Sequence, residues 1–173
     1  MPANRGGDAL SDLTRAIEID PGNASAYVAR GQAALYSGDS TQSIDDFLTA
    51  HRLLPTNPYT VLWLHIARTH RGEDDAKEFR DNSENLPRDA WPGALLGLYD
   101  GSVSPEQLRN MSVTNSWGHA NHACDLDFYT GEYAAHHRSK VEAHRLLAQA
   151  QHECTPDQIG FIAIKGELEL VKE

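Results

Sequence analysis

The sequence predicts an all-α protein built from antiparallel helix hairpins that stack in an array. The first observation is spacing: Pro21 and Pro55 lie 34 positions apart, and each ends a segment with helical periodicity. The second is that small and bulky residues between these prolines occur at the intervals of a packed hairpin. The third is that the same intervals return near the C-terminus. The matched positions are Gly31, Ser43, Phe47 and Ala50 in the first segment and Gly131, Ala143, Leu147 and Ala150 in the second.

Length and charge limit the architecture and the partners. The chain has 173 residues, which suits one domain or a short repeat array with a continuous core. Its 15 Lys and Arg residues against 25 Asp and Glu residues give a net charge of -10, which repels phosphate backbones. We therefore expect no nucleic acid partner. The apolar runs are too short to span a bilayer, so we also expect no transmembrane segment.

The segment 24–55 is the best-defined hairpin. Residues 37–39 form its turn, Gly31 lets the two helices approach closely, and Phe47 fills the space that small residues leave. Counted from Ala24, six positions match the tetratricopeptide pattern: Tyr27, Gly31, Ser43, Phe47, Ala50 and Pro55. The segment therefore resembles the tetratricopeptide repeat (TPR) family. The resemblance implies a right-handed superhelix whose concave face binds a peptide or helix of another protein.

Other segments keep parts of this pattern. Residues 8–21, with periodic Ala9, Leu13 and Ala16, match only the second helix of a repeat. Residues 58–87 form a degenerate repeat, whose second helix has polar residues where a small and a bulky residue are expected. Those two polar residues are Lys77 and Asp81.

The rest of the chain is predicted to be an insertion, a repeat and a cap. Residues 88–118 form an irregular helical insertion, which includes a capping box at 104–107. Residues 124–155 form another repeat, and 156–173 form a helix that caps the array. The cap is expected to turn Ile159, Ile162 and Leu168 toward the array and Glu167, Glu169, Lys172 and Glu173 toward water.

The N-terminal half repeat has an apolar face without a predicted partner. Leu10, Leu13 and Ile17 form this face. We interpret the chain as a fragment of a longer protein in which a preceding helix covers these residues. A second copy of the chain, which would form a homodimer, is the alternative.

The TPR resemblance also implies a partner-binding groove. Position by position, it assigns to that groove Val28, Gln32, Tyr36, Tyr59, Leu62, Ile66 and His70. TPR domains that grip a C-terminal carboxylate carry lysine, arginine and asparagine at such positions, whereas this chain has residues such as Val28 and Tyr59. The expected ligand is therefore an apolar peptide or helix of a partner protein. Burial of Tyr59, Leu62 and Ile66 by the next repeat is the alternative.

A narrower resemblance covers residues 26–173. The segments 91–99 and 128–133 are similar to those of TPR lipoproteins of the Gram-negative envelope, which act as adaptors for hydrolases and proteases. This resemblance implies a scaffold or adaptor in the periplasm. The lipid-bearing cysteine and signal of such proteins do not occur in this sequence, so the cytoplasm stays the alternative compartment.

The two cysteines bear on the compartment. Cys124 precedes the first helix of the last hairpin and Cys154 ends the second, and antiparallel helices bring such ends together. A bridge would close a loop of about 31 residues and stabilise the fold by roughly 3 to 4 kcal/mol. Structural disulfides favour an oxidising compartment. Two free, buried thiols in a cytosolic protein are the alternative.

Histidines suggest an alternative function. Six of the nine histidines lie in the segment 119–152. A zinc site would use two thiolates and two imidazoles from one end of the last hairpin, taken from His119, His122, Cys124, His152 and Cys154. The His-x-Cys spacing is shorter than zinc sites use, and surface histidines explain the pattern more simply. We therefore assign no metal ligand and no cofactor.

Catalytic signatures are missing from the sequence. It contains no GxSxG, no phosphate-binding glycine loop and no HExxH. The acidic runs at 45–46 and 73–75 are expected on solvated helix or turn positions. The sequence therefore predicts a non-enzymatic module that binds another protein.

Overall fold

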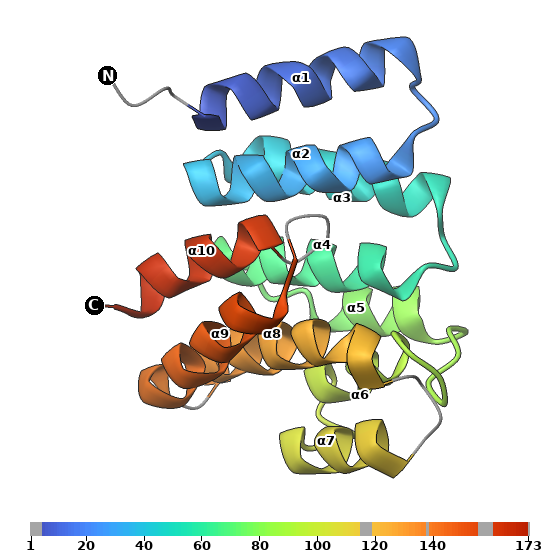
Figure 1. Cartoon of the computed structure of the whole chain (residues 1–173). Coiled ribbons are helices and arrows are strands. Elements are labelled where there is room, and N and C mark those ends of the chain that lie inside the picture. The colour runs from blue at the N-terminus through green and yellow to red at the C-terminus, as the bar shows by residue number, and fades with distance from the viewer. Residues whose placement is uncertain (1–4, 115–118, 138, 156–160, 173) are drawn as a thin grey trace. The chain divides into compact units, whose positions relative to one another are not determined.

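The computed structural model describes residues 5–114, 119–137, 139–155 and 161–172, and all regular structure within these ranges is helical (Figure 1). The prediction of an all-α protein is confirmed for this part of the chain. None of these helices is long and apolar enough to cross a lipid bilayer. The chain divides into two compact units, Met1–Leu86 (unit 1) and Pro87–Glu173 (unit 2). One continuous superhelical array stays a prediction.

Unit 1 is a series of helices that pack in the order of the sequence. Its described helices are α1 (Arg5–Ile19), α2 (Ala24–Ser37), α3 (Ser40–Leu53), α4 (Pro58–His70) and α5 (Ala76–Ser83). Each helix contacts the next one, and α2 also contacts α4 (Figure 1). The α2/α3 pair forms an antiparallel hairpin where the sequence predicts the best-defined repeat.

Local capping fixes the turn of this hairpin. Gly38 ends α2 with a φ of 91°, a left-handed conformation that glycine adopts without strain. Asp39 then begins α3, because its side chain accepts a hydrogen bond of 3.0 Å from the backbone N–H of Gln42. The predicted turn is therefore confirmed.

Gly31 and Phe47 set the distance between α2 and α3. A Cβ atom on residue 31 would lie 2.8 Å from Cε1 of Phe47, whose side chain is fully buried. The Phe47 ring stacks in turn on Trp63 of α4, with ring centroids 5.8 Å apart. The small residue therefore lets an aromatic ring fill the hairpin, as the sequence predicted. The contact of this ring with the next helix is a finding of the structure.

The α5 helix packs in a register that the TPR pattern did not predict. Lys77 and Asp81, which occupy the pattern positions, are exposed, and Phe79 is buried instead. The Phe79 ring lies against His65 of α4, with ring centroids 4.6 Å apart. Phe79 therefore supplies the bulky side chain in this part of the core, from a face of α5 other than the one that carries Lys77 and Asp81.

The apolar face of α1 is less open than the sequence predicted. Ile17 is buried, while Leu10 and Leu13 are half-buried, because α1 packs on α2. The large apolar residue that α1 does expose is Ile19, at 73%. The expectation of an uncovered face is wrong for Ile17, and the fragment and the homodimer remain untested hypotheses.

Unit 2 combines short helices with a longer hairpin. Its described helices are α6 (Ala94–Tyr99), α7 (Pro105–Thr114), α8 (His119–His137), α9 (Lys140–Glu153) and α10 (Phe161–Val171). The α8 and α9 helices pack along each other, and α10 packs on both. The α6 and α7 helices contact each other and α8. The capping box is confirmed, since Ser104 and Gln107 exchange hydrogen bonds of 2.8 and 3.1 Å at the start of α7.

The α8/α9 hairpin repeats the construction of α2/α3 at positions shifted by 100 residues. A Cβ atom on Gly131 would lie 2.9 Å from Cγ of Leu147, which is fully buried. Ser139 caps the start of α9 as Asp39 caps α3. The same arrangement of a glycine against a large buried side chain therefore closes a hairpin in each unit.

Two predictions about the ends of unit 2 are wrong. The first helix of its hairpin begins at His119, so Cys124 lies inside α8 and does not precede it. In α10, Glu167 is buried instead of solvated, and Ile162 is 44% exposed instead of buried. The buried stripe consists of Ala163, Ile164, Glu167, Leu168 and Val171, which follow helical spacing. Ile159 lies outside the described residues.

Candidate functional site

The predicted groove residues lie on two neighbouring helices of unit 1. Val28, Gln32 and Tyr36 belong to α2, and Tyr59, Leu62, Ile66 and His70 belong to α4. Tyr36 and His70 join the two helices edge to face, with ring centroids 6.0 Å apart. The structure therefore places the residues that were assigned to one groove on helices that contact each other.

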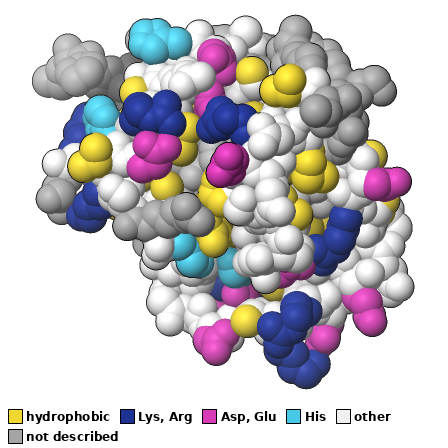
Figure 2. Space-filling view, turned by 90° about the horizontal axis from the view of Figure 1, so that it is seen from below, with side chains coloured by type: hydrophobic (Ala, Val, Ile, Leu, Met, Phe, Trp, Pro, Cys, Tyr) yellow, Lys and Arg dark blue, Asp and Glu magenta, His cyan; other side chains and the backbone are white. Residues whose placement is uncertain are grey.

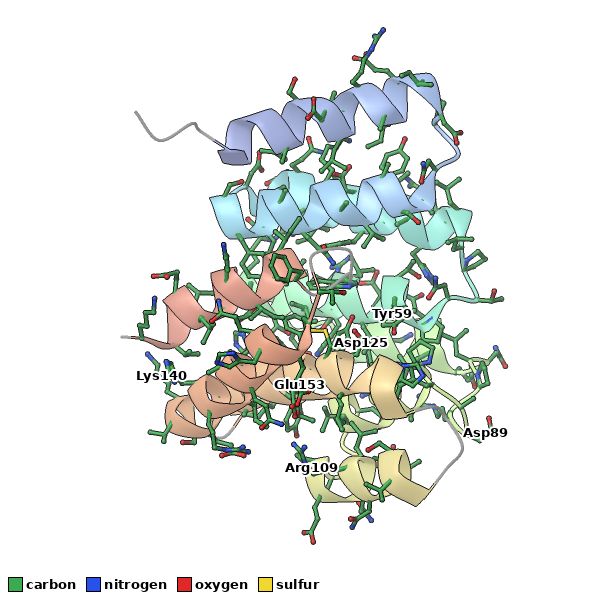
Figure 3. The ribbon with its side chains drawn as sticks, in the orientation of Figure 1. Tyr59, Asp89, Arg109, Asp125, Lys140 and Glu153 are labelled. Atoms are coloured by element: carbon green, nitrogen blue, oxygen red, sulfur yellow. A yellow bond between two sulfur atoms is a disulfide. The ribbon has the colours of Figure 1, made fainter. Side chains whose placement is uncertain are left out.

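Burial separates these residues into two groups. Leu62 and Ile66 are fully buried, in agreement with the alternative that packing accounts for them, and Gln32 is buried as well. The remaining four residues are half-buried: Val28, Tyr36, Tyr59 and His70. Figure 3 labels Tyr59, which lies near the start of α4. The half-buried group is therefore the part of the set that offers surface to a ligand.

Two acidic residues that were predicted on the surface of unit 1 are buried instead. Asp46, which is 2% exposed, accepts hydrogen bonds of 2.9 and 2.8 Å from Nε and Nη2 of Arg30. Asp75 lies 2.8 Å from Nδ1 of His65. Each carboxylate joins two parts of the helix stack, so these groups have a structural role.

Cys124 and Cys154 form a disulfide in unit 2, with Cα atoms 4.9 Å apart. Cys124 lies in α8 and Cys154 caps the end of α9, so the bridge joins the two helices of the hairpin (Figure 3). Both residues are buried. Of the two alternatives that the sequence left open, the structure contains the bridge.

The disulfide removes both thiolates from the zinc site that the sequence suggested. His122 is also engaged elsewhere, because its ring stacks on Trp91 with centroids 5.0 Å apart. His152 is exposed on the last turn of α9. In the oxidised protein, the proposed set of two thiolates and two imidazoles is therefore not available at this end of the hairpin.

A charged pocket of about 270 Å³ lies between α7, α8 and α9. Its lining residues are Pro105, Glu106, Arg109, Thr130, Ala134, Glu142, Arg145 and Leu146. Both arginines are paired: Arg109 Nη1 lies 3.2 Å from Asp127 Oδ1, and Arg145 Nη2 lies 2.7 Å from Glu142 Oε1. Figure 2 shows the same mixture more widely, with Lys and Arg side chains beside Asp and Glu side chains.

Asp127 is the buried carboxylate beside this pocket. Burial raises its pKa, Arg109 lowers it, and the charge and hydrogen bond of Glu153 raise it again. Figure 3 labels Arg109, on α7, and Glu153, on α9, the two residues that act on Asp127 from neighbouring helices. The Arg109–Asp127 ion pair joins α7 to α8, so we assign this pair to holding α7 against the hairpin.

A second buried polar cluster lies between α6, α8 and α10. The Tyr99 hydroxyl lies 2.5 Å from Oε2 of Glu132, to which it donates, and 3.2 Å from the carbonyl oxygen of Tyr129. Glu132 and Glu167 are 1% and 0% exposed. Burial and the charges of both glutamates hold the pKa of Tyr99 well above its ordinary value, so this hydroxyl remains a donor.

Sequence reasoning missed this cluster because it assigned acidic residues to the surface. One signal could have found it: Glu132 and His136 are four residues apart, so they share one face of α8. That face also carries Phe128 and Tyr129, both fully buried, which places Glu132 in the core.

Taken together, the fold and these sites define an all-α protein that has a glycine-closed helix hairpin in each of two units. Buried carboxylates and one disulfide tie the helices together. A comparison with protein-family models finds no match for this chain. The helical architecture alone therefore assigns the protein to its class, that of all-α proteins built from helix hairpins.

Proposed function

We propose that the protein is a non-enzymatic interaction module of the TPR type, which binds an apolar peptide or helix of a partner protein. The observation that carries the proposal is the contact between α2 and α4. In a TPR array the first helices of successive hairpins line the concave face. Because α2 and α4 are the first helices of successive hairpins, their contact supports that arrangement in unit 1.

The construction of the hairpins gives separate support. Gly31 faces Phe47 and Gly131 faces Leu147, so the close approach that TPR hairpins need occurs twice. A right-handed superhelical stacking of the hairpins is part of the proposal.

The chemistry of the half-buried groove residues favours an apolar ligand. Val28 supplies an aliphatic surface, and Tyr36 and Tyr59 are rings that contribute large contact areas with few rotatable bonds. None of the residues that the resemblance assigns to the groove is a lysine or arginine. A free carboxylate would lack a matching charge among them, so we expect recognition through side chains of the ligand.

Site-specific crosslinking tests the proposal and identifies the partner in the same experiment. A photoreactive residue placed at Val28 or Tyr36 should give one crosslinked protein, and the same residue at Asp45, exposed on α3, should not. The crosslinked segment should then bind as a synthetic peptide. Tyr36→Ala combined with Tyr59→Ala should weaken that binding by about 30-fold, since aromatic anchors dominate such interfaces.

The controls separate binding from folding. Far-UV circular dichroism and the unfolding midpoint should show that the double variant stays folded. Unchanged peptide affinity in a folded double variant, or equal crosslinking from Asp45, would contradict the proposal that α2 and α4 bind the partner.

The disulfide supports an oxidising compartment, and we propose the periplasm. Cells should be lysed directly into denaturant that contains an alkylating reagent, so that buried thiols react as well, and the mass of the protein then measured. A protein in which Cys124 and Cys154 escape alkylation agrees with this compartment. Full alkylation of both residues places the protein in a reducing compartment instead.

A further inference from the structure

A pocket of unit 2 lies between the start of α9 and the end of α10. Its volume is about 400 Å³, and its lining residues are Lys140, Val141, His144, Val171 and Lys172. Figure 3 labels Lys140, which is the first residue of α9. We propose that this pocket binds a small aliphatic monocarboxylate, whose carboxylate lies between the two lysines and whose hydrocarbon chain contacts the two valines.

The charge of the lining favours an anion. Every ionisable side chain among the lining residues is basic, although the chain as a whole has a net charge of -10. Within the part of the chain that the structure describes, no carboxylate pairs with Lys140. Lys172 lies 2.6 Å from Glu169, but both side chains of this pair are exposed. Because exposed pairs contribute little to stability, a ligand carboxylate can take the place of Glu169.

The basic groups reach the pocket from two helices. Lys140 and His144 are four positions apart, so they share one face of α9. Lys172 follows the end of α10, which packs on α9. A carboxylate accepts hydrogen bonds from ammonium and imidazole N–H groups, and the flexible stems of two lysines let both donors adjust to one carboxylate. The pocket therefore offers several donors to a single anionic group.

The apolar part of the lining selects the kind of anion. Val141 is 81% exposed, whereas Val171 is buried and forms a fixed wall. A hydrocarbon chain in the pocket would remove the Val141 side chain from water, which is favourable. Free phosphate or sulfate would pair with the lysines but leave this valine in water. A volume near the lower end of the range of small-molecule pockets, about 300 to 1,000 Å³, suits a short chain.

Titration of the full-length protein with hexanoate tests the site. Calorimetry and NMR should both show one saturable site. Each methylene added between butanoate and hexanoate should raise the affinity by up to about fourfold, the effect of burying one such group. Hexanamide, which has a similar shape but no charge, should bind at least about tenfold more weakly. Added salt should weaken hexanoate binding because it screens the exposed lysines.

Lysine variants with a matched control test the charged part of the pocket. Lys140→Gln and Lys172→Gln should each weaken hexanoate binding by about fivefold, the effect of one exposed charge pair with good geometry. Lys165→Gln makes the same change of charge at an exposed position of α10 outside the pocket. This control should bind hexanoate as the wild type does. Equal weakening by Lys165→Gln would overturn the site, since it would indicate a response to net charge alone.

A valine variant tests the apolar part. Val141→Thr should lower the affinity for hexanoate by about threefold and leave the affinity for acetate unchanged, because acetate has no chain that reaches this residue. The lysine variants should weaken binding of both anions. Lys140, Val141, Lys165 and Lys172 are all exposed, so every variant should keep the unfolding midpoint of the wild type. Equal effects of Val141→Thr on both anions would contradict the assignment of the hydrocarbon chain.

Two other ligands would use the same lysines and are distinguished directly. Adsorption of the protein to phosphatidylglycerol vesicles without hexanoate binding would overturn the proposal in favour of a membrane surface. Binding of a peptide with a free C-terminal leucine, without hexanoate binding, would overturn it in favour of a protein terminus. The absence of saturable hexanoate binding up to about 10 mM would also overturn it. The site uses no residue of α2 or α4, so its failure leaves the proposed groove unaffected.

Discussion

Reduction of the Cys124–Cys154 disulfide should destabilise unit 2 selectively. The bridged residues are 30 positions apart and enclose most of the α8/α9 hairpin. On the chain-entropy model, a closed loop of roughly 30 residues lowers the entropy of the unfolded chain enough to stabilise the native state by about 3.7 kcal/mol. This is a large share of the stability of a small unit, which is typically about 5 to 15 kcal/mol.

Urea unfolding with and without a non-thiol reductant measures this effect, and hydrogen exchange locates it. The wild type should lose about 3 to 4 kcal/mol of unfolding free energy on reduction. Exchange should increase in peptides from α8 and α9 and much less in peptides from α2 and α3. A variant with Cys124→Ala and Cys154→Ala is the control, because its stability should not respond to reductant. A loss below about 1 kcal/mol, or equal exchange in both hairpins, would refute this reasoning.

Three further predictions concern packing, charge and pH. Gly31→Ala should lower the free energy of unfolding by up to about 2 kcal/mol, since a clash with buried Phe47 outweighs the gain in helix propensity. Adding Phe47→Leu to this variant should restore part of the lost urea midpoint. Asp46→Ala should lower the free energy of unfolding in urea by about 3 kcal/mol. The substitution leaves Arg30, whose side chain is 16% exposed, without its buried carboxylate partner. Asp127 has a folded pKa above its ordinary 3.8, so the folded state retains the proton longer than the unfolded state does. Its contribution to stability is therefore complete below pH 3.8 and declines as the pH rises through the folded pKa. Urea unfolding between about pH 3.5 and 7 should show this decline in the wild type and a smaller one in Asp127→Asn; equal slopes would contradict it.

The hairpins could be predicted because their signals are local. Gly31 and Phe47 lie on helices joined by a two-residue turn, so sequence spacing alone indicates that they face each other. The turn follows in the same way from the conformational freedom of Gly38. Cys124 and Cys154 end close together for the same reason, because both belong to one hairpin.

The predictions of burial are wrong where the rotation of a helix about its axis depends on contacts with residues outside that helix. Phe79 faces the core because of how α5 sets against α4, and no spacing rule within α5 fixes that rotation. The same holds for Glu167, whose charge suggested solvent although its helix turns it inward. Asp46 was wrongly predicted to be exposed because its partner, Arg30, lies 16 positions earlier. Buried polar groups depend on such tertiary partners, which hydrophobic periodicity does not report.

The serial packing of unit 1 also affects how it opens. Since each helix contacts the next one along the chain, stability should vary along the stack as it does in repeat proteins. Because α1 packs on α2, whereas α3 packs on both α2 and α4, detachment of α1 should break fewer contacts than opening of α3. Such partial unfolding would uncover Leu10, Leu13 and Ile17 together with the side of α2 that they cover, while the α2/α3 hairpin stays folded. If α1 opens in this way, its rate of opening would limit how quickly another molecule reaches that side of α2.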